Sequence, residues 1–372
     1  MQETVPFPKK FAIGYFFAGP GKFLELIRPH LASILEIYFP FPGILSAREL
    51  RDSTDEQLRA RLFPDLREFR RLGLKLDLLI NATCYGEKSY STEWRIAIER
   101  AIAMLDEEGV KPEIVTTTSP FVATVLKRKH PDIEIRASVN LKIGSTLAME
   151  YVSDLYDSFY MSRDLQRDIP TLRRFSEWCA QHGKKLCMLA NSGCLRNCPG
   201  QIFHETLLAH GFWRIGQETA LLKKGPLLCR NIFSSSSNFE EILRATWIRP
   251  EDLHLYAPYV SAFKLSTRDL SGDAKPILDA YCSGRFDGDL LTILDPNFSE
   301  DFGPKMIDNS AFPSDWAESG TAGLCAINCT HCGKCSAVLE RVLKDNPNYK
   351  PKKNDFSFKL DYSAPGQYSF TF

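Results

Sequence analysis

Eight short apolar runs, rich in β-branched and aromatic residues, recur along the chain as far as residue 265, and helical patterns separate them. They occupy residues 11–17, 34–39, 75–81, 113–117, 133–139, 158–161, 185–190 and 261–265. Strands that alternate with helices build a parallel sheet, and closure of that sheet suits a chain of 372 residues. The sequence therefore predicts an α/β fold, a (β/α)8 TIM-type barrel.

An open, doubly wound sheet is the alternative fold. Sheets of that kind that bind dinucleotides carry a G-x-G-x-x-G turn directly after the first strand. Residues 18–21 of this chain read Ala-Gly-Pro-Gly and lack that form. The sequence thus carries no dinucleotide fingerprint, and the barrel remains the favoured fold.

Two regions follow from the pattern of predicted strands. Residues 1–295 would form the barrel, with a long insertion over about 191–258, between the seventh and eighth strands. Ordinary loops at this position have about two to six residues, and a long insertion at the active face is usually functional. Residues 296–372 would form a cysteine-rich iron–sulfur extension and tail.

Charge and cysteine content limit the class of protein. Lys+Arg and Asp+Glu both number 46, so generic electrostatic attraction to nucleic acid is not expected, although a local basic patch remains compatible with this balance. The first eleven residues, MQETVPFPKKF, lack a secretory apolar core, and no apolar run is long enough for a membrane span. The 11 cysteines cluster, which predicts metal ligation in a reducing cytoplasm and not a disulfide framework.

Four cysteines lie close together near the end of the sequence: Cys325, Cys329, Cys332 and Cys335, in the spacing C-x3-C-x2-C-x2-C. Structural zinc sites usually draw two C-x2-C pairs from separated segments, whereas ferredoxin-type clusters take closely spaced cysteines from one loop. A set of reduced surface thiols is disfavoured, because exposed thiols are reactive. The run therefore predicts a 4Fe–4S cluster, with zinc as the alternative.

A second group of cysteines follows the seventh predicted strand. Cys194 and Cys198 form a C-x3-C-P pair, and Cys229 lies downstream in the same insertion. C-x3-C-P also occurs in the cluster-binding run of bacterial ferredoxins. These thiols predict a second metal site at the barrel mouth, with Cys84 or Cys282 as candidates for a fourth ligand. Two incidental thiols near a turn are the alternative.

Basic residues stand at the carboxyl ends of predicted strands, where barrel enzymes place their reactive groups. Arg136 lies in the fifth predicted strand and Arg163 follows the sixth, while Lys264 lies near the end of the eighth and Arg268 follows it. Such cations can hold a carboxylate or phosphate, so we predict that they bind an anionic part of a substrate. Ordinary ion pairing with Asp164 and Asp269 is the alternative.

Three segments resemble the collagenase-like peptidase family, also called the U-32 family. Residues 160–165, Tyr-Met-Ser-Arg-Asp-Leu, are similar to its "LSREL" segment, and residues 263–268 are similar to its "KIEGR" segment, with Ser-Thr in place of Glu-Gly. The stretch 191–198, with Cys229 and Arg230 downstream, resembles its cysteine-bearing stretch after a barrel strand.

The resemblance implies a 4Fe–4S protein that supports oxygen-independent hydroxylation of an RNA base or of a small aromatic, quinone-type metabolite. It implies that Cys194, Cys198 and Cys229 are cluster ligands, so that the chain would hold one cluster or two. We expect an oxidoreductase with an electron-donor protein and an anionic small-molecule or RNA substrate as partners, in a homo- or hetero-oligomer. The family's older peptidase label keeps a hydrolase as the alternative, although neither G-x-S-x-G nor H-E-x-x-H is present.

The terminal run is also similar to the C-x3-C-x2-C motif of radical S-adenosylmethionine enzymes, through Cys325, Cys329 and Cys332. Those enzymes carry the motif after the first barrel strand and leave one iron open for the cofactor. Here the motif follows the eighth strand, and Cys335 offers a fourth thiolate. A cluster with all four irons ligated by cysteine suits electron transfer. A further alternative for the whole chain is a non-catalytic partner subunit that is stabilised by metal.

Overall fold

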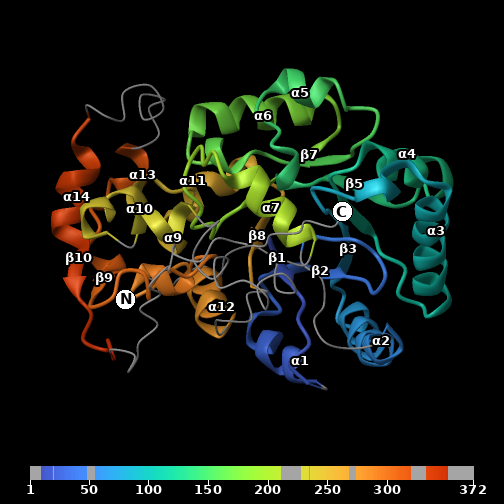
Figure 1. The fold of residues 1–372 in the computed structure, drawn as a ribbon, viewed down its shortest axis with the longest axis horizontal. Helices are drawn as coiled ribbons and strands as arrows, with labels where there is room; N and C mark the ends of the chain where they lie inside the picture. Colours follow the sequence, from blue (N-terminus) through green and yellow to red (C-terminus); the bar gives the residue numbers. More distant parts are fainter. Residues whose placement is uncertain are drawn as a thin grey trace, which may run out of the picture.

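A closed barrel of eight parallel strands forms the centre of the molecule (Figure 1). The computed structural model describes residues 10–19, 21–47, 55–210, 228–233, 235–267, 274–319 and 332–350. Neighbouring strands pair in chain order, and β1 pairs with β8 to close the barrel. The strands are β1 (Phe11–Gly14), β2 (Ile34–Pro40), β3 (Lys75–Ile80), β4 (Ile114–Thr117), β5 (Glu134–Ala137), β6 (Ser158–Tyr160), β7 (Lys185–Leu189) and β8 (Ala262–Leu265). All eight predicted strands and the predicted barrel are confirmed.

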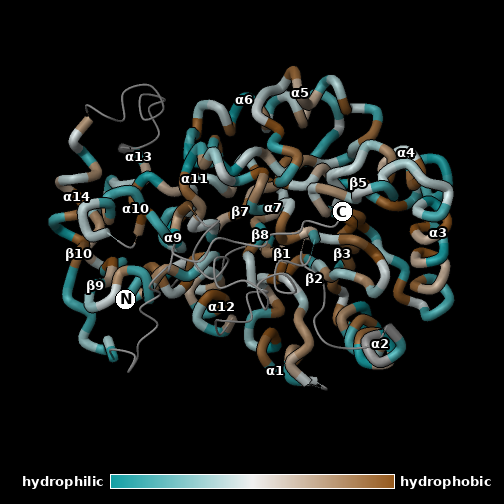
Figure 2. Tube along the Cα trace, viewed as in Figure 1, coloured by the Kyte–Doolittle hydropathy of each residue, from teal (hydrophilic) through white to brown (hydrophobic). Residues whose placement is uncertain are grey.

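Helices surround the barrel, and Figure 2 shows that they mix polar with apolar residues along their length. Asp168, with Pro170 two residues later, is predicted from the sequence to cap a helix, and its side chain does accept a hydrogen bond from the backbone N–H of Thr171. The helices are α1 (Lys22–Ile27), α2 (Asp55–Arg71), α3 (Thr92–Glu107), α4 (Pro120–Lys129), α5 (Thr146–Glu150), α6 (Ile169–Gln181), α7 (Gln201–Ala209), α9 (Leu228–Phe233), α10 (Glu241–Arg244), α11 (Leu253–Tyr256), α12 (Ala274–Ser283), α13 (Trp316–Ser319) and α14 (Lys334–Val342). None of the helices within the described ranges is long and apolar enough to cross a membrane.

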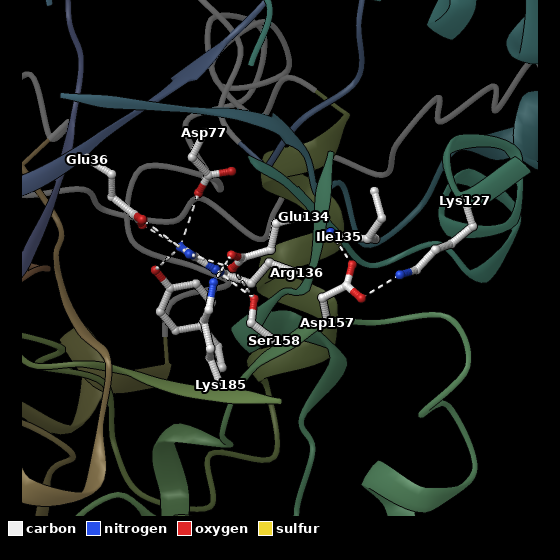
Figure 3. Close-up of polar contacts among 10 residues, drawn as sticks. Glu36, Asp77, Lys127, Glu134, Ile135, Arg136, Asp157, Ser158 and Lys185 are labelled. Carbon is white, nitrogen blue, oxygen red and sulfur yellow. Dashed lines mark hydrogen bonds and ion pairs between the residues drawn. The ribbon is translucent and has the colours of Figure 1, made fainter. Parts of the chain in front are cut away.

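The barrel interior is charged (Figure 3). Arg136 of β5 donates to Glu36 of β2 and, at 3.0 Å, to Glu134. Since β2 and β5 are not neighbours, the Arg136–Glu36 ion pair crosses the inside of the barrel. Asp77 of β3 lies 3.7 Å from the same guanidinium, and Ser158 accepts its Nε–H at 3.1 Å. Branched apolar side chains usually fill this space, so the network replaces part of the ordinary core.

The region after residue 296 packs onto the barrel through an aromatic cluster. The Arg167 guanidinium lies beside the stacked rings of Trp247 and Trp316, 5.2 and 5.1 Å from their centroids. It also donates to the carbonyls of Leu243 and Ala245. Phe312 and Trp316 belong to the same buried core as the outward-facing side chains of the barrel strands. In Figure 1, α13, α14 and β9–β10 accordingly lie beside α9 and α10.

Two expectations for this region are wrong in detail. The residues from 296 onward have no regular apolar pattern, which predicts irregular structure, but β9 (Lys305–Ile307) and β10 (Leu343–Asp345) form a small antiparallel sheet there. A helix is predicted over 336–344, whereas α14 begins at Lys334 and ends at Val342. The helix ends early because the next residues pair with β9, which satisfies their backbone groups in the ladder.

Candidate metal-thiolate site at the barrel mouth

The loop after β7 carries the first two candidate ligands, Cys194 and Cys198. Asn191 fixes the start of this loop: its side chain donates to the carbonyl of Ser266 at 2.9 Å and accepts from the Ser266 N–H at 2.8 Å. Further along, the backbone N–H of Asn197 donates to the Asp164 carboxylate at 2.8 Å. The loop is therefore tied to the ends of β6 and β8, so both cysteines lie at the carboxyl mouth of the barrel.

The third candidate ligand, Cys229, lies on α9, which approaches the same loop. A Cβ on Gly200 would meet Leu228 at 2.9 Å and the Cys198 sulfur at 3.9 Å, so the first residue of α9 touches the loop. Burial raises the pKa of the Cys229 thiol to about 12, and the charges of Cys194 and Cys198 add to the rise. Burial and the charge of Cys194 likewise raise the pKa of Cys198. The structure thus brings these three predicted ligands within electrostatic range of one another.

Arg163 binds the sulfur of Cys194. Its Nη1 donates to Cys194 Sγ at 3.2 Å, and its Nη2 donates to Asn140 Oδ1 at 3.0 Å and to Glu205 Oε1 at 2.5 Å. Gln201 donates to the same Glu205 oxygen at 3.1 Å. Burial alone would lower the pKa of the Arg163 guanidinium, but its interactions with Cys194 and Glu205 raise it above its ordinary value. The guanidinium is therefore a fixed cation beside the thiol.

The region after residue 296 holds α9 in place. Arg230, next to Cys229, pairs with Asp301 at 2.5 Å and lies over the ring of Phe298, 5.7 Å from its centroid. Phe233, at the end of α9, packs edge-on against Phe298 with centroids 4.7 Å apart. The position of Cys229 consequently depends on a segment about 70 residues later in the chain.

The two cysteines considered as a fourth ligand lie in different places. Cys84 follows β3 at the carboxyl mouth, and the adjacent Thr83 lies 3.5 Å from Thr206 of α7, measured between hydroxyl oxygens. Cys282 of α12 instead shares a hydrogen bond with Ser33, which precedes β2 at the amino end of the barrel. Only Cys84 of this pair therefore shares an end of the barrel with Cys194.

The arrangement of these thiols differs from the one that a single metal ion requires. Four thiolates that bind one zinc ion all lie about 2.3 Å from it. Within the described ranges, no group of three or more His, Cys, Asp or Glu side chains is arranged to hold a metal ion. A cluster presents a separate iron to each thiolate and so accepts ligands that are further apart.

Lys264, predicted to bind an anion, lies inside the barrel. Its Nζ is 3.9 Å from the ring centroid of Tyr38 and 5.3 Å from that of Tyr160. Burial raises the pKa of the nearby Asp77 carboxyl to about 6, although Arg136 and Lys264 oppose this shift. Lys264 is thus part of the charged interior.

The remaining predicted residues belong to the later part of the chain. Arg268, Cys325 and Cys329 lie outside the described residues. Cys332 is exposed and Cys335 is half-buried at the start of α14, with Gly333 in the left-handed region between them at φ 62°. A left-handed residue at this position favours glycine, and it lets the chain turn from one cysteine into the helix that carries the other.

Sequence reasoning missed the charged interior and the partners of Arg163. The interior had a visible signal, because a charged residue interrupts an apolar strand at the same position in four cases: Glu36, Asp77, Arg136 and Lys264. Glu205 carried no such signal, since it is one of several polar residues in a helical pattern.

The chain is similar in sequence to one archaeal protein and in fold to several solved structures. The chain is 24% identical over 284 residues to an uncharacterized protease of Methanocaldococcus jannaschii, and the match covers 74% of this chain and 79% of that protein. A solved U32 peptidase is similar with a TM-score of 0.49 and 14% identity, over 72% of this chain and 96% of that chain. A muconate lactonizing enzyme has a TM-score of 0.34 at 12% identity, over 54% of this chain and 51% of that one. No protein-family model matches. The sequence relationship is thus to an archaeal protein that is named as a protease, and the U-32 assignment remains the resemblance that the motifs carry.

Proposed function

We propose that the chain is an iron–sulfur oxidoreductase in which Cys194, Cys198 and Cys229 hold a 4Fe–4S cluster at the barrel mouth. The observation that carries the proposal is the approach of α9, which bears Cys229, to the loop of Cys194 and Cys198, where the Arg163 guanidinium is bonded to Cys194. Like-charged thiolates repel one another in a buried place, and binding of a metal centre relieves that repulsion. Cys84 is the candidate for the fourth ligand.

The residues around this site would divide the work as follows. Arg163 donates to the sulfur of Cys194, and Arg230 holds α9 so that Cys229 stays at the mouth. When bound, the cluster supplies one-electron redox chemistry. Arg268 is proposed to hold the anionic part of a substrate, which would be an RNA base or a small aromatic metabolite, whereas Lys264 is buried in the barrel interior. The reaction class is a redox modification, with oxygen-independent hydroxylation as the specific proposal.

The terminal cysteines are proposed to hold a second cluster. Cys325, Cys329, Cys332 and Cys335 offer four thiolates, which leaves no iron open and suits electron transfer. This cluster would pass electrons between a donor protein and the mouth.

Metal analysis of the chain purified without oxygen tests the proposal. We expect about eight irons and eight acid-labile sulfides per chain if both cysteine groups are filled, and about four of each if one is filled. Zinc without sulfide would contradict the redox function and favour a partner subunit held by a structural metal.

A hydrolase is the second candidate, and the name of the archaeal relative, an uncharacterized protease, is the observation that favours it. The two candidates differ in their dependence on the thiols. Peptide hydrolysis that survives removal of metal and serine replacement of Cys194, Cys198 and Cys229 would support the hydrolase. Loss of all activity on metal removal would count against it.

A further inference from the structure

We propose that Arg163 positions the thiolate of Cys194 and thereby raises the reduction potential of the cluster. In this proposal Arg163 does not bind substrate. This inference rests on the proposed function, because it requires a redox centre at the barrel mouth. It replaces the expectation that Arg163 binds an anionic part of the substrate. The property that Arg163 would set is the reduction potential of the cluster at the barrel mouth.

The contacts of the guanidinium carry the inference. Its two terminal nitrogens are already bonded to protein groups, one to the Cys194 sulfur and the other to Asn140 and Glu205. Arg163 is only 9% exposed, which leaves little of it accessible to a substrate arriving from solvent. A buried guanidinium whose terminal nitrogens are already bonded in this way is suited to holding the neighbouring Cys194 side chain in place.

Glu205 and Gln201 make the arrangement rigid. Both are buried on α7, at 7% and 5% exposure, and Gln201 donates to the same Glu205 oxygen that accepts from Arg163. A planar guanidinium held by an ion pair on one nitrogen has its other donors in fixed directions. The N–H that reaches Cys194 is therefore directed by α7, in the way that outer partners direct metal-binding side chains.

The consequence for a cluster is electrostatic. Reduction adds negative charge to the cluster and its thiolates, and a hydrogen bond from a cation to a ligand sulfur stabilises the more negative state. Low exposure reduces the screening of this charge by water. Arg163 should therefore favour the reduced state. Its Nε–H is also buried and has no acceptor in the described part of the chain, which leaves one donor for a further acceptor.

Redox titration of the anaerobically purified full chain, followed by the spectrum of the reduced cluster, tests the inference. Two variants are used. R163K keeps the charge but cannot reach the sulfur and Glu205 together, and R163Q combined with E205Q removes both charges and so leaves no unpaired ion. We expect the double variant to shift the reduction equilibrium at least tenfold toward the oxidised state, about 59 mV for a one-electron couple, and R163K to shift it less.

R196Q is the matched control. Arg196 lies in the same loop, but its Nε–H donates to the backbone carbonyl of Asp164 at 3.1 Å and not to sulfur. Its removal should shift the equilibrium less than about threefold, since a half-buried charge is screened by solvent. Equal shifts in R196Q and the double variant would show that the bond from Arg163 to the Cys194 sulfur has no specific effect on the potential, and would overturn the inference.

The remaining outcomes are also decisive. Loss of iron from R163K that keeps its folded circular dichroism spectrum would support positioning of Cys194. An unchanged potential and iron content in both Arg163 variants would overturn the inference and leave the proposed function intact. A wild-type chain without iron and sulfide would overturn the proposed function, and this inference with it.

Discussion

Serine in place of Cys194 is expected to remove one cluster, about four irons and four sulfides per chain, from the anaerobically purified protein. Serine preserves the size of the side chain but is a poor ligand for iron, so the change tests ligation with little effect on packing. Cys198→Ser and Cys229→Ser should have the same effect, because all three thiols serve one site. Iron and sulfide analysis of each variant measures the loss.

Cys282→Ser is the control for these variants. Cys282 is half-buried, as the three candidate ligands are, but it lies beside Ser33 at the opposite end of the barrel. Its replacement should leave iron and sulfide at the wild-type level. Equal iron in Cys194→Ser and wild type would show that this thiol is not a ligand, and equal losses in all four variants would indicate general instability.

Replacement of Arg136 by methionine is expected to lower the free energy of unfolding by about 3–5 kcal/mol, because it leaves buried carboxylates without their cation. Glu36 and Asp77 are fully buried, and Glu134 has a pKa of about 2 because Arg136 and Lys185 outweigh the effect of burial. Methionine fills a volume similar to that of arginine. The loss of stability therefore comes mainly from the missing charge and not from a cavity. Urea unfolding followed by circular dichroism measures the change.

The effect of Arg136→Met should depend on pH. Beside Arg136, burial already raises the pKa of Asp77 to about 6, and loss of the cation would raise it further. A carboxyl whose pKa is higher in the folded state than in the unfolded state destabilises the fold as pH rises through the folded value. The loss of stability is therefore expected to be larger at pH 8 than at pH 5.

Arg71→Met provides the matched comparison. Arg71 forms a two-bond ion pair with Glu68 on α2, at 2.7 and 2.8 Å, but its side chain is 71% exposed. An exposed pair of this kind contributes little to stability, because solvent screens its charges. Equal, small effects of Arg71→Met and Arg136→Met would contradict the view that the interior network stabilises the barrel.

The order of the strands could be predicted from the sequence because each barrel strand packs its outer face against helices. That packing requires a short run of apolar residues in each strand. The helices between these runs show apolar residues at helical spacing, so eight alternations of strand and helix can be recognised in the sequence. The sheet of β9 and β10 could not be predicted, because each strand has three residues, too few for a period. Its pairing also joins residues almost 40 positions apart.

The cysteines could be predicted as a group, but their surroundings could not. The spacing of Cys194 and Cys198 is a local signal, whereas the contact of Arg163 with Glu205 joins residues 42 positions apart. Whether a cation at a strand end faces solvent or a thiol depends on such long-range contacts. For this reason the sequence favoured a substrate-binding role for Arg163, and the geometry favours a role beside sulfur.

The most direct test is iron and sulfide analysis, with a spectrum of the reduced protein, on a chain in which Cys325, Cys329, Cys332 and Cys335 are all replaced by serine. Removal of these thiols leaves the mouth as the proposed cluster site. We predict that about four irons and four sulfides per chain remain, with the spectrum of a reduced 4Fe–4S cluster. A folded protein that retains no iron and no sulfide would contradict the assignment of Cys194, Cys198 and Cys229 as cluster ligands.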